Sequence, residues 1–508
     1  CLRFTILATV EEDTKEIGVM KAIGVGRRDI RRIYLTKYVV IGVLGSVAGY
    51  VASRYLNPIL SANVMLYIGR APKGLVGRAL PMLGAGGVGL TVVISCALIL
   101  RRLRKITAVE ALRSGDLGRH PARLSVLNLK NSGPLGVNVF LGFRDVVQRC
   151  RLFGLMGFIF VFCAFVIIVP MHFLTTMQSP SFISYMGIGQ SDIRIDLRQS
   201  DDMAERFERL LASLADDPEV ERYAPLVTSQ FTMVGDNGAE ETISVETGDF
   251  SVFPLDYVEG KAPESEHEIA LSSLNAREMD KRVDDTVVLL VDGEKREMRV
   301  CGIYQDVTNG GRTAKAVLPY EPDNVLWRAV SLDVTGSGSS IDEKVREYAE
   351  AFHPARVTDL EGYLSQTLGN TIAQLRKVTV VAVGVGLCVA GLITSLFLTM
   401  LISKDGSQIA IMRSLGFSLH DIRVQYLSRA LLLLGLGIVL GTVFSNTIGQ
   451  RLVSALWALM GASQIRFVID PIRAYVLLPS LLMLAVSVTT LLSIRGIKET
   501  NIAEMIVE

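Results

Sequence analysis

Few residues of this sequence stand in patterns that could carry out catalysis. The five histidines are scattered along the chain: His120, His172, His267, His353 and His420. None forms an H-E-x-x-H helix or a cysteine/histidine cluster, the patterns that hold zinc. The phosphate loop G-x-x-x-x-G-K-[ST] and the nucleophile turn G-x-S-x-G are absent as well. The acids at 264–268 and 284–285 are typical of a solvated face, with cation binding or hydrolysis as the alternative. We therefore expect no enzyme activity, no metal and no cofactor in this chain.

One segment with charged residues and glycine at fixed spacing occurs twice. Residues 16–35 read EIGVMKAIGVGRRDIRRIYL and residues 408–427 read QIAIMRSLGFSLHDIRVQYL; we call them the first and the second elbow. At this offset of 392, eight of the nineteen positions from Ile17 to Leu35 are identical. Each copy follows the end of an apolar segment and precedes two more. The sequence therefore predicts two equivalent membrane repeats.

Each elbow has the pattern of a short amphipathic helix, a turn and a second helix that leads into the membrane. Ile17, Met20 and Ile23 recur at helical spacing and predict one apolar stripe. Gly24 and Gly416 stand where the C-terminal end of a helix needs a left-handed residue. The first helix of each elbow is therefore expected to end at its glycine.

The second helix of each elbow begins with a conspicuous carboxylate. Ser418 and Asp421 have the spacing of a capping box, with Asp in place of the usual Glu or Gln. Asp29 and Asp421 also place negative charge where it suits the helix dipole. Two such elbows on the cytoplasmic side would form a docking surface for a partner with two-fold symmetry. The alternative is a helix at the lipid interface, with its basic residues on phosphates.

Six apolar segments come close to or exceed the length of about 20 residues that a membrane-spanning helix needs. They are Tyr38–Ser53, Ala79–Leu100, Leu152–Met177, Val378–Ser403, Ala430–Gln450 and Ala474–Ile494. Residues 1–10 have the pattern of the last turns of another membrane helix. We therefore expect a fragment whose N-terminal part is absent.

The charges of the chain are divided between two regions. Of its 51 acids and 52 bases, residues 178–372 hold 37 acids and 18 bases, whereas the remainder is net basic. This division excludes a nucleic-acid binder whose whole surface is basic. Lys and Arg gather in 11–37, 101–151 and 404–429, which the positive-inside rule places in the cytoplasm. Counting the crossings then places 178–372 outside and the C-terminus inside.

Residues 178–372 have the pattern of an α+β domain. The predicted helices are Asp201–Leu214, with Ser200 as its N-cap, and Ile341–Ala351. The predicted strands are Phe231–Val234 and Thr242–Val245, and a hairpin joins Thr286–Val291 to Glu297–Ile303 across Asp292-Gly293. Thr358–Lys377 has the pattern of a stalk helix that continues into the span at Val378. The stalk would either transmit motion or serve as a passive spacer.

The segment 16–24 (EIGVMKAIG) resembles the cytoplasmic signature of the FtsX/MacB-like permease family of ABC transporters. The resemblance covers both membrane repeats, and residues 257–305 are similar to the periplasmic core domain of MacB-type proteins. In that family the signature contains the coupling helix that contacts an ATPase subunit. The second copy departs from the pattern at Gln408, Ala410 and Ser414. This departure implies a weaker contact there, or two inequivalent nucleotide sites.

The resemblance implies an α-helical polytopic membrane protein whose extracytoplasmic α+β domain resembles the MacB periplasmic core domain. The expected domains are a truncated first repeat (1–113), a cytoplasmic linker (114–151), a transmembrane helix (152–177), the extracytoplasmic domain with its stalk (178–372) and the second repeat (373–508). The ATPase-coupling residues that the resemblance implies are Glu16, Ile17, Met20, Lys21, Gly24, Asp29, Gln408, Ile409, Met412, Arg413, Gly416 and Asp421.

The function implied by the resemblance is that of a multi-pass permease subunit in a bacterial plasma membrane. Its expected partners are a cytoplasmic ABC ATPase acting as a dimer, the lipid bilayer, and an extracytoplasmic substrate or protein; nucleic acid is not expected. ATP hydrolysis in the partner would drive export, extraction or mechanotransmission through the extracytoplasmic domain. The alternative is a non-transporting ABC-type regulator or sensor that controls an extracellular partner.

Overall fold

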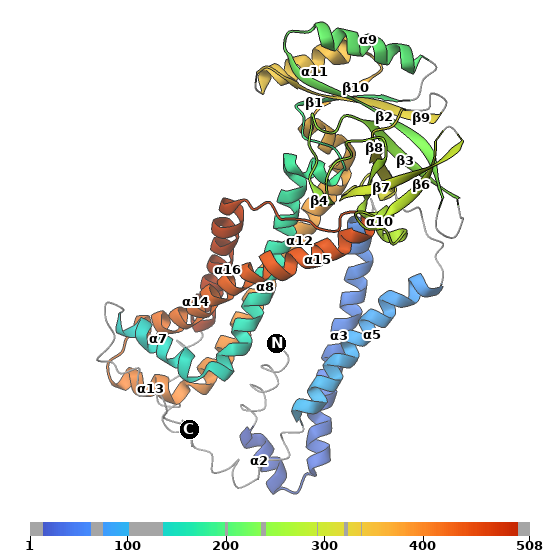
Figure 1. Ribbon diagram of the computed structural model, residues 1–508. Coiled ribbons are helices and arrows are strands. Elements are labelled where there is room, and N and C mark those ends of the chain that lie inside the picture. Colours follow the sequence, from blue (N-terminus) through green and yellow to red (C-terminus); the bar gives the residue numbers. More distant parts are fainter. Residues whose placement is uncertain are drawn as a thin grey trace. The chain divides into compact units, whose positions relative to one another are not determined.

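The structure, a computed structural model, describes most of the chain (Figure 1). The described residues are 14–61, 75–100, 136–198, 202–234, 240–291, 293–319, 324–336 and 338–495. The predicted helix end at 1–10, the N-cap Ser200 and the loop residue Asp292 lie outside this part. The chain is divided into two compact units. The helical unit comprises Cys1–Pro170, Lys377–Phe444 and Pro471–Glu508, and the sheet unit comprises Met171–Arg376 and Ser445–Asp470.

Six helices of the described residues are long and apolar enough to cross a membrane. Their spans are Arg28–Tyr55, Pro81–Leu98, Leu152–Gln178, Leu360–Lys404, Leu419–Met460 and Arg473–Ile494. Each overlaps one of the six predicted segments, which confirms that prediction. The corresponding helices are α3 (Arg27–Ser61), α5 (Leu75–Leu100), α8 (Cys150–Gln178), α12 (Leu360–Lys404), α14 (Leu419–Phe444) and α16 (Leu478–Ile494). Shorter helical elements are α2 (Thr14–Ala22), α7 (Val137–Gln148), α13 (Gly406–Ser414), η6 (Ser445–Gly449), α15 (Gln450–Trp457), η7 (Ala458–Met460) and η8 (Arg473–Leu477).

Close helix packing in the helical unit depends on small residues. Gly437 of α14 faces α8, and a Cβ at this position would lie 2.6 Å from the Cβ of Phe160. The ring of Phe153 of α8 packs against that of Phe397 of α12, with centroids 5.3 Å apart. Glycine thus lets two backbones approach where a larger side chain would separate them. Large apolar side chains on the opposite faces, such as Leu436, are exposed, as expected of helices solvated by lipid.

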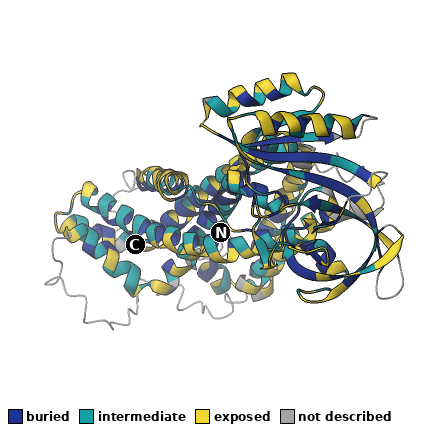
Figure 2. Ribbon diagram, turned by 45° about the horizontal axis from the view of Figure 1, so that its top comes forward, coloured by how far each residue is buried: buried dark blue, intermediate teal, exposed yellow. Residues whose placement is uncertain are grey.

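The sheet unit begins with a four-stranded antiparallel layer that two helices cover. The elements are β1 (Ile193–Arg198), α9 (Met203–Asp216), β2 (Val220–Val234), β9 (Val325–Val334), α11 (Ser339–Ala351) and β10 (Arg356–Asp359). Their order, β10-β1-β9-β2, is that of the ferredoxin-like split βαβ arrangement. Figure 2 shows the buried strands in dark blue beneath two helices whose outer sides are exposed. Because side chains alternate along a strand, Ile193 and Ile195 pack under the helices while Arg194 and Asp196 point to the other face.

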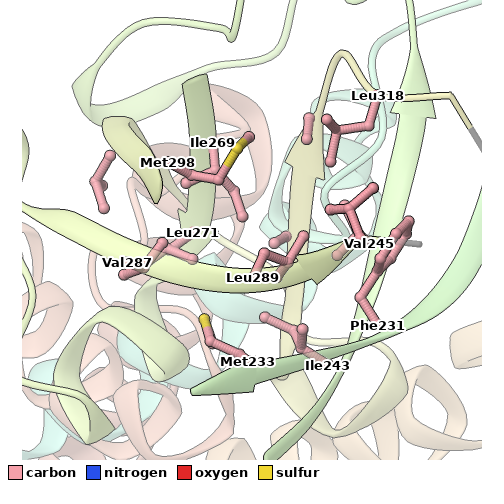
Figure 3. Packing of buried hydrophobic residues seen from close by; sticks show 14 of the residues in the cluster. Phe231, Met233, Ile243, Val245, Ile269, Leu271, Val287, Leu289, Met298 and Leu318 are labelled. Atoms are coloured by element: carbon pink, nitrogen blue, oxygen red, sulfur yellow. The ribbon is translucent and has the colours of Figure 1, made fainter. Parts of the chain in front are cut away.

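The end of β2 and five of the strands between β2 and β9 form a six-stranded barrel. Its other strands are β3 (Glu240–Gly248), β5 (Glu268–Ser272), β6 (Thr286–Val291), β7 (Glu294–Tyr304) and β8 (Thr313–Ala316). Pairing runs β2-β3-β8-β5-β7-β6 and returns to β2, so the ring is closed. Apolar side chains such as Phe231, Leu271 and Leu289 point toward one another inside the ring (Figure 3). Outside the ring lie β4 (Tyr257–Gly260), α10 (Ser273–Glu278), η3 (Pro180–Tyr185) and η4 (Asn309–Gly311).

Most elements predicted in this region are present, with longer strands. The predicted hairpin is confirmed: β6 and β7 pair up to Val291 and Glu294, which leaves a two-residue loop, and Gly293 has φ +78°. β2 begins at Val220 rather than Phe231 because its first half pairs with β9. The stalk helix is also confirmed, but it begins at Leu360 because Thr358 pairs with Arg194 in the sheet.

The segment between α14 and α16 attaches to the base of the sheet unit. The indole of Trp457 packs edge-on against Phe173, with ring centroids 5.2 Å apart. The backbone N–H of Val468 donates to Thr176 Oγ1 at 3.0 Å. Residues 445–470 therefore belong to the sheet unit rather than to the helical unit, an attachment that the sequence did not predict.

Candidate functional site

The first elbow ends its first helix with a glycine cap. Gly24 has φ +95°, and the N–H of Val25 donates to the carbonyl of Met20 at 2.9 Å. This bond across six residues is the mark of the Schellman motif. The left-handed conformation costs an L-residue about 1–2 kcal/mol, which explains the glycine. The next helix begins with the N–H of Asp29 donating to the carbonyl of Gly26 at 2.9 Å.

The second elbow repeats this cap and adds another. Gly416 has φ +94°, and the N–H of Phe417 donates to the carbonyl of Met412 at 3.1 Å. Ser418 then donates from its N–H and its hydroxyl to Asp421 Oδ2, at 2.9 and 2.6 Å. The N–H of Asp421 donates back to Ser418 Oγ at 3.1 Å. The predicted capping box therefore forms, with Asp in the role usually taken by Glu.

Each elbow buries one face. In the first, Ile17, Ile30 and Tyr34 form a buried cluster that includes Cys96 of α5. The residues at the offset of 392 are buried as well: Ile409, Ile422 and Tyr426. Duplication of the sequence is thus accompanied by duplication of the buried positions.

The opposite face of each elbow exposes a pair of apolar side chains. Val19 and Ile23 are 47% and 76% exposed, and the residues at the offset, Ile411 and Leu415, are 59% and 73% exposed. The sequence missed these pairs because it grouped Ile23 with Ile17 and Met20 in one apolar stripe. Ile23 follows the last residue of α2 and lies in the turn. Their i, i+4 spacing at the same position of both copies is the signal that could have identified them.

The structure places the twelve predicted coupling residues as follows. Five are exposed: Glu16, Gly24, Asp29, Gln408 and Gly416. Five are partly buried: Met20, Lys21, Met412, Arg413 and Asp421. Two are buried, Ile17 and Ile409. Each set of six lies on one elbow, and the two buried isoleucines hold their helices in place instead of facing solvent.

A buried cluster of charges joins the second elbow to α7. Arg149 donates to Asp405 Oδ1 at 2.7 Å, and its Nε lies 3.0 Å from Asp145 Oδ1. Nη1 of Arg429 lies 3.2 Å from Asp145 Oδ2 and 3.3 Å from Asp405 Oδ2. Tyr426 donates to Asp405 Oδ2 at 3.3 Å. Burial would lower the pKa of Arg149, but the hydrogen bond and the charge of Asp405 raise it above its ordinary value.

Helix α7 also approaches α14 closely beside this cluster. A Cβ on Gly142 would lie 2.2 Å from Ser428 Oγ and 3.0 Å from the carbonyl oxygen of Gln425. Asn138 Nδ2 donates to Asp421 Oδ1 at 2.8 Å and so reaches the capping box itself. The second elbow is therefore braced by a helix that precedes the span α8.

Both elbows lie in regions of the chain that match a known protein family. The family described as FtsX-like permease C-terminal matches residues 1–108 and 380–502. The ABC transporter permease YtrF of Bacillus subtilis (strain 168) is 36% identical over 73 residues, which are 14% of this chain and 17% of that protein. The chain thus covers much less than two thirds of the length of this curated relative.

Three solved structures are similar to this chain at low identity. The periplasmic region of MacB from Actinobacillus actinomycetemcomitans is 14% identical and covers 36% of this chain and 95% of its own, with a TM-score of 0.26. A domain of a permease protein from Porphyromonas gingivalis is 13% identical, covering 33% of this chain and 88% of its own, with a TM-score of 0.22. The extracellular domain of the noncanonic ABC-type transporter YknZ from Gram-positive bacteria is 12% identical, covering 33% and 100%, with a TM-score of 0.25.

The family match covers both ends of the chain and includes helices that can cross a membrane. Residues 1–108 and 380–502 therefore match the FtsX-like permease C-terminal family, and a segment of the chain is similar to an ABC transporter permease.

Proposed function

We propose that this chain is the membrane subunit through which a separate cytoplasmic ATPase moves an extracytoplasmic domain. ATP hydrolysis takes place in the partner, which acts as a dimer and docks on both elbows. The basic segments and the C-terminus lie in the cytoplasm, and residues 178–372 lie outside. Movement of that domain serves export, extraction from the membrane or mechanotransmission.

The exposed apolar pairs of the elbows carry this proposal. Val19 with Ile23 and Ile411 with Leu415 stand at matched positions behind matched glycine caps. An amphipathic helix whose apolar side chains enter a groove of the partner is a common mode of recognition. Two copies at the two ends of one chain fit a partner that presents two such grooves.

The stalk offers a path from the membrane to the extracytoplasmic domain. Helix α12 is continuous from Leu360 to Lys404, and α13, which carries the first part of the second elbow, begins directly after it at Gly406. Asp405, at this junction, accepts hydrogen bonds from Arg149 and Arg429. A displacement of the second elbow is therefore applied to the end of the same helix that enters the sheet unit.

The test is co-purification of the ATPase with elbow variants. The tagged full chain is extracted in detergent from membranes of its own host, and P-loop ATPases that accompany it are identified by mass spectrometry. Two charge-bearing double variants, Val19→Asp with Ile23→Asp and Ile411→Asp with Leu415→Asp, are compared with Leu459→Asp. Leu459 is as exposed as Ile23 but lies in the segment attached to the sheet unit.

We expect each double variant to reduce recovery of the ATPase about tenfold or more, because two apolar anchors are lost from a docking surface. The control should recover it as the parent does. An elbow that lies at the lipid interface instead would lose its contact with lipid in the double variants without any change in the amount of ATPase recovered per chain. That second result, or the absence of any P-loop ATPase, would overturn the proposal.

A further inference from the structure

The sheet unit contains a cavity of about 550 Å³ between the four-stranded layer and the barrel. Arg194 and Asp196 reach it from the face of β1 that is turned away from α9 and α11. Glu246 of β3 and Lys315 of β8 line it from the barrel. The first turns of α12 close it with Tyr363. A volume of this size is ordinary for a site that encloses a small molecule.

One buried arginine in the wall of the cavity has a donor group without a partner. Arg194 is 5% exposed. Its Nε donates to Asp196 Oδ1 at 3.0 Å, and its Nη2 lies 4.0 Å from Glu246 Oε1. Its Nη1 has no hydrogen-bond partner among the described residues. A buried donor of a charged group is costly to leave unpaired, so an acceptor from a ligand would be stabilising there.

The remaining charges of the cavity make a strongly charged ligand unfavourable. Three cations line it, namely Arg194, Lys315 and Arg356, together with three acids, namely Asp196, Glu246 and Asp306. The Nζ of Lys315 pairs with Glu246, so part of this charge is already neutralised. A polyanion would meet the carboxylates, and a simple cation would meet the guanidinium groups. A ligand with one charge of each sign can pair with both.

Asp306 is the acid best placed to receive the positive group of such a ligand. It is 4% exposed, and its hydrogen-bond donors are the neutral groups of Thr308 and Thr313, at 2.5–2.7 Å. Burial raises the pKa of Asp306 to about 6, because desolvation disfavours its charged form. An ammonium group beside it would offset that cost.

Aromatic rings supply the apolar part of the wall. Trp327 lines the cavity from β9. The ring of Tyr363 lies 5.5 Å from the guanidinium carbon of Arg194 and 5.8 Å from that of Arg356. These cation–π contacts hold both guanidinium groups beside the first turn of α12.

We propose that this cavity binds a small zwitterion, a free amino acid or a di- or tripeptide. Its carboxylate accepts from Arg194 Nη1, and its ammonium group lies against Asp306. Because Tyr363 belongs to α12, the occupied cavity contacts the helix that continues into the membrane span. Binding does not depend on an ATPase and is measured without nucleotide, so it can fail or succeed independently of the proposed coupling.

The test uses the intrinsic fluorescence of the full chain in detergent. The chain has two tryptophans, and Trp457→Phe leaves Trp327 in the cavity as the only one. The probes are trialanine, acetyl-trialanine without its ammonium group, trialanine amide without its carboxylate, and inorganic phosphate. We expect a saturable change with trialanine, and binding about tenfold or more weaker for each of the other three, since each loses a charge-assisted hydrogen bond.

Two further variants assign the binding to this cavity. Thr367→Phe, at a lining position of α12, fills space without removing a charge and should abolish the response. Ser365→Phe places the same side chain on an exposed position of the same helix that does not line the cavity, and should leave the response intact. Arg194→Lys keeps the charge but loses the fork of donors and should weaken binding about tenfold or more.

Three outcomes would overturn the proposal. The first is the absence of a saturable response to trialanine in the chain that carries Trp457→Phe. The second is equal affinity for the capped peptides, or tighter binding of phosphate. The third is an equal response from Thr367→Phe and Ser365→Phe, which would place the binding elsewhere.

Discussion

The two elbows have the same glycine caps and the same buried and exposed positions. They differ in the elements that pack against them. Both close with a left-handed glycine, bury the same three positions and expose the same apolar pair. The second elbow is in addition tied to α7 by the charges of Asp145, Arg149, Asp405 and Arg429. At the offset of 392, Lys37 stands in place of Arg429 and is exposed. Duplicated surfaces therefore need not move alike when a partner binds both of them.

This difference in support has a consequence for coupling. A helix end that is held by buried ion pairs transmits a displacement to the elements that supply the charges. For the second elbow these elements are α7, α14 and the end of α12. Under the proposed function, the second elbow would drive the stalk, while the first elbow would mainly hold the ATPase in place.

The largest difference between the two elbows should follow from removing Arg429, the cation that pairs with both Asp145 and Asp405. Arg429→Met leaves Asp145 and Asp405 without one of their partners, and we expect it to destabilise the second elbow by about 3–5 kcal/mol. Lys37→Met, at the matching exposed position, should stay within about 0.5 kcal/mol. Hydrogen exchange of the elbow amides, followed by mass spectrometry of the full chain in detergent, measures both. Equal effects on the two elbows would contradict the idea of a braced second elbow.

The contact between α7 and α14 can also be disrupted without removing a charge. Gly142→Val places a side chain against Ser428 and the backbone of Gln425, and overpacking of this kind costs about 1–3 kcal/mol. Gly154→Val is the matched control, since a Cβ there would have no neighbour within 4 Å. Thermal unfolding should separate the two variants. Protection of the first elbow against exchange should not change in either, and a loss there would mean that the elbows are not independent.

The glycine caps should respond alike, because their geometry is the same. Gly24→Ala and Gly416→Ala each force an L-residue into the left-handed region, at about 1–2 kcal/mol apiece. A Cβ at either position meets nothing within 4 Å, so the cost is one of backbone conformation alone. Exchange of the last amides of α2 and α13 should accelerate by similar factors. A cost confined to one elbow would show that the Schellman motifs are not equivalent.

The smallest effect concerns the start of the second helix. Ser418→Ala removes the capping box of the second elbow and should cost about 1 kcal/mol. Gly26→Ser introduces the missing hydroxyl in the first elbow, where Asp29 already stands at the right spacing, and should gain a few tenths of a kcal/mol. Exchange of the first-turn amides of α3 and α14 is the measurement. Destabilisation by Gly26→Ser would show that Asp29 cannot turn to accept from a hydroxyl there.

Features with a local signal were predictable from the sequence. The six spans follow from the length of the apolar runs, the caps from Gly24 and Gly416, and the hairpin from Asp292-Gly293. In each case the residues that determine the structure are neighbours in the chain.

Features that depend on distant residues were not predictable. The ion pair between Arg149 and Asp405 joins positions 256 residues apart, and nothing in the local pattern distinguishes Asp405 from an ordinary helix-end acid. The cavity brings together β1, β3, β8 and α12, and Arg194 reads locally as a polar residue on a half-exposed strand. The exposed pair at Val19 and Ile23 was missed for another reason, since an apolar residue near a helix end can face either way.

The closed pairing of β2, β3, β8, β5, β7 and β6 limits how another protein can recognise the barrel. A strand added to a sheet needs a row of free backbone N–H and carbonyl groups along an edge. In this ring every strand has a neighbour on both sides, so no member offers such an edge along its paired length. A protein partner of the barrel must therefore be selected by side chains, through shape and charge, and its affinity should be sensitive to point substitutions on the surface.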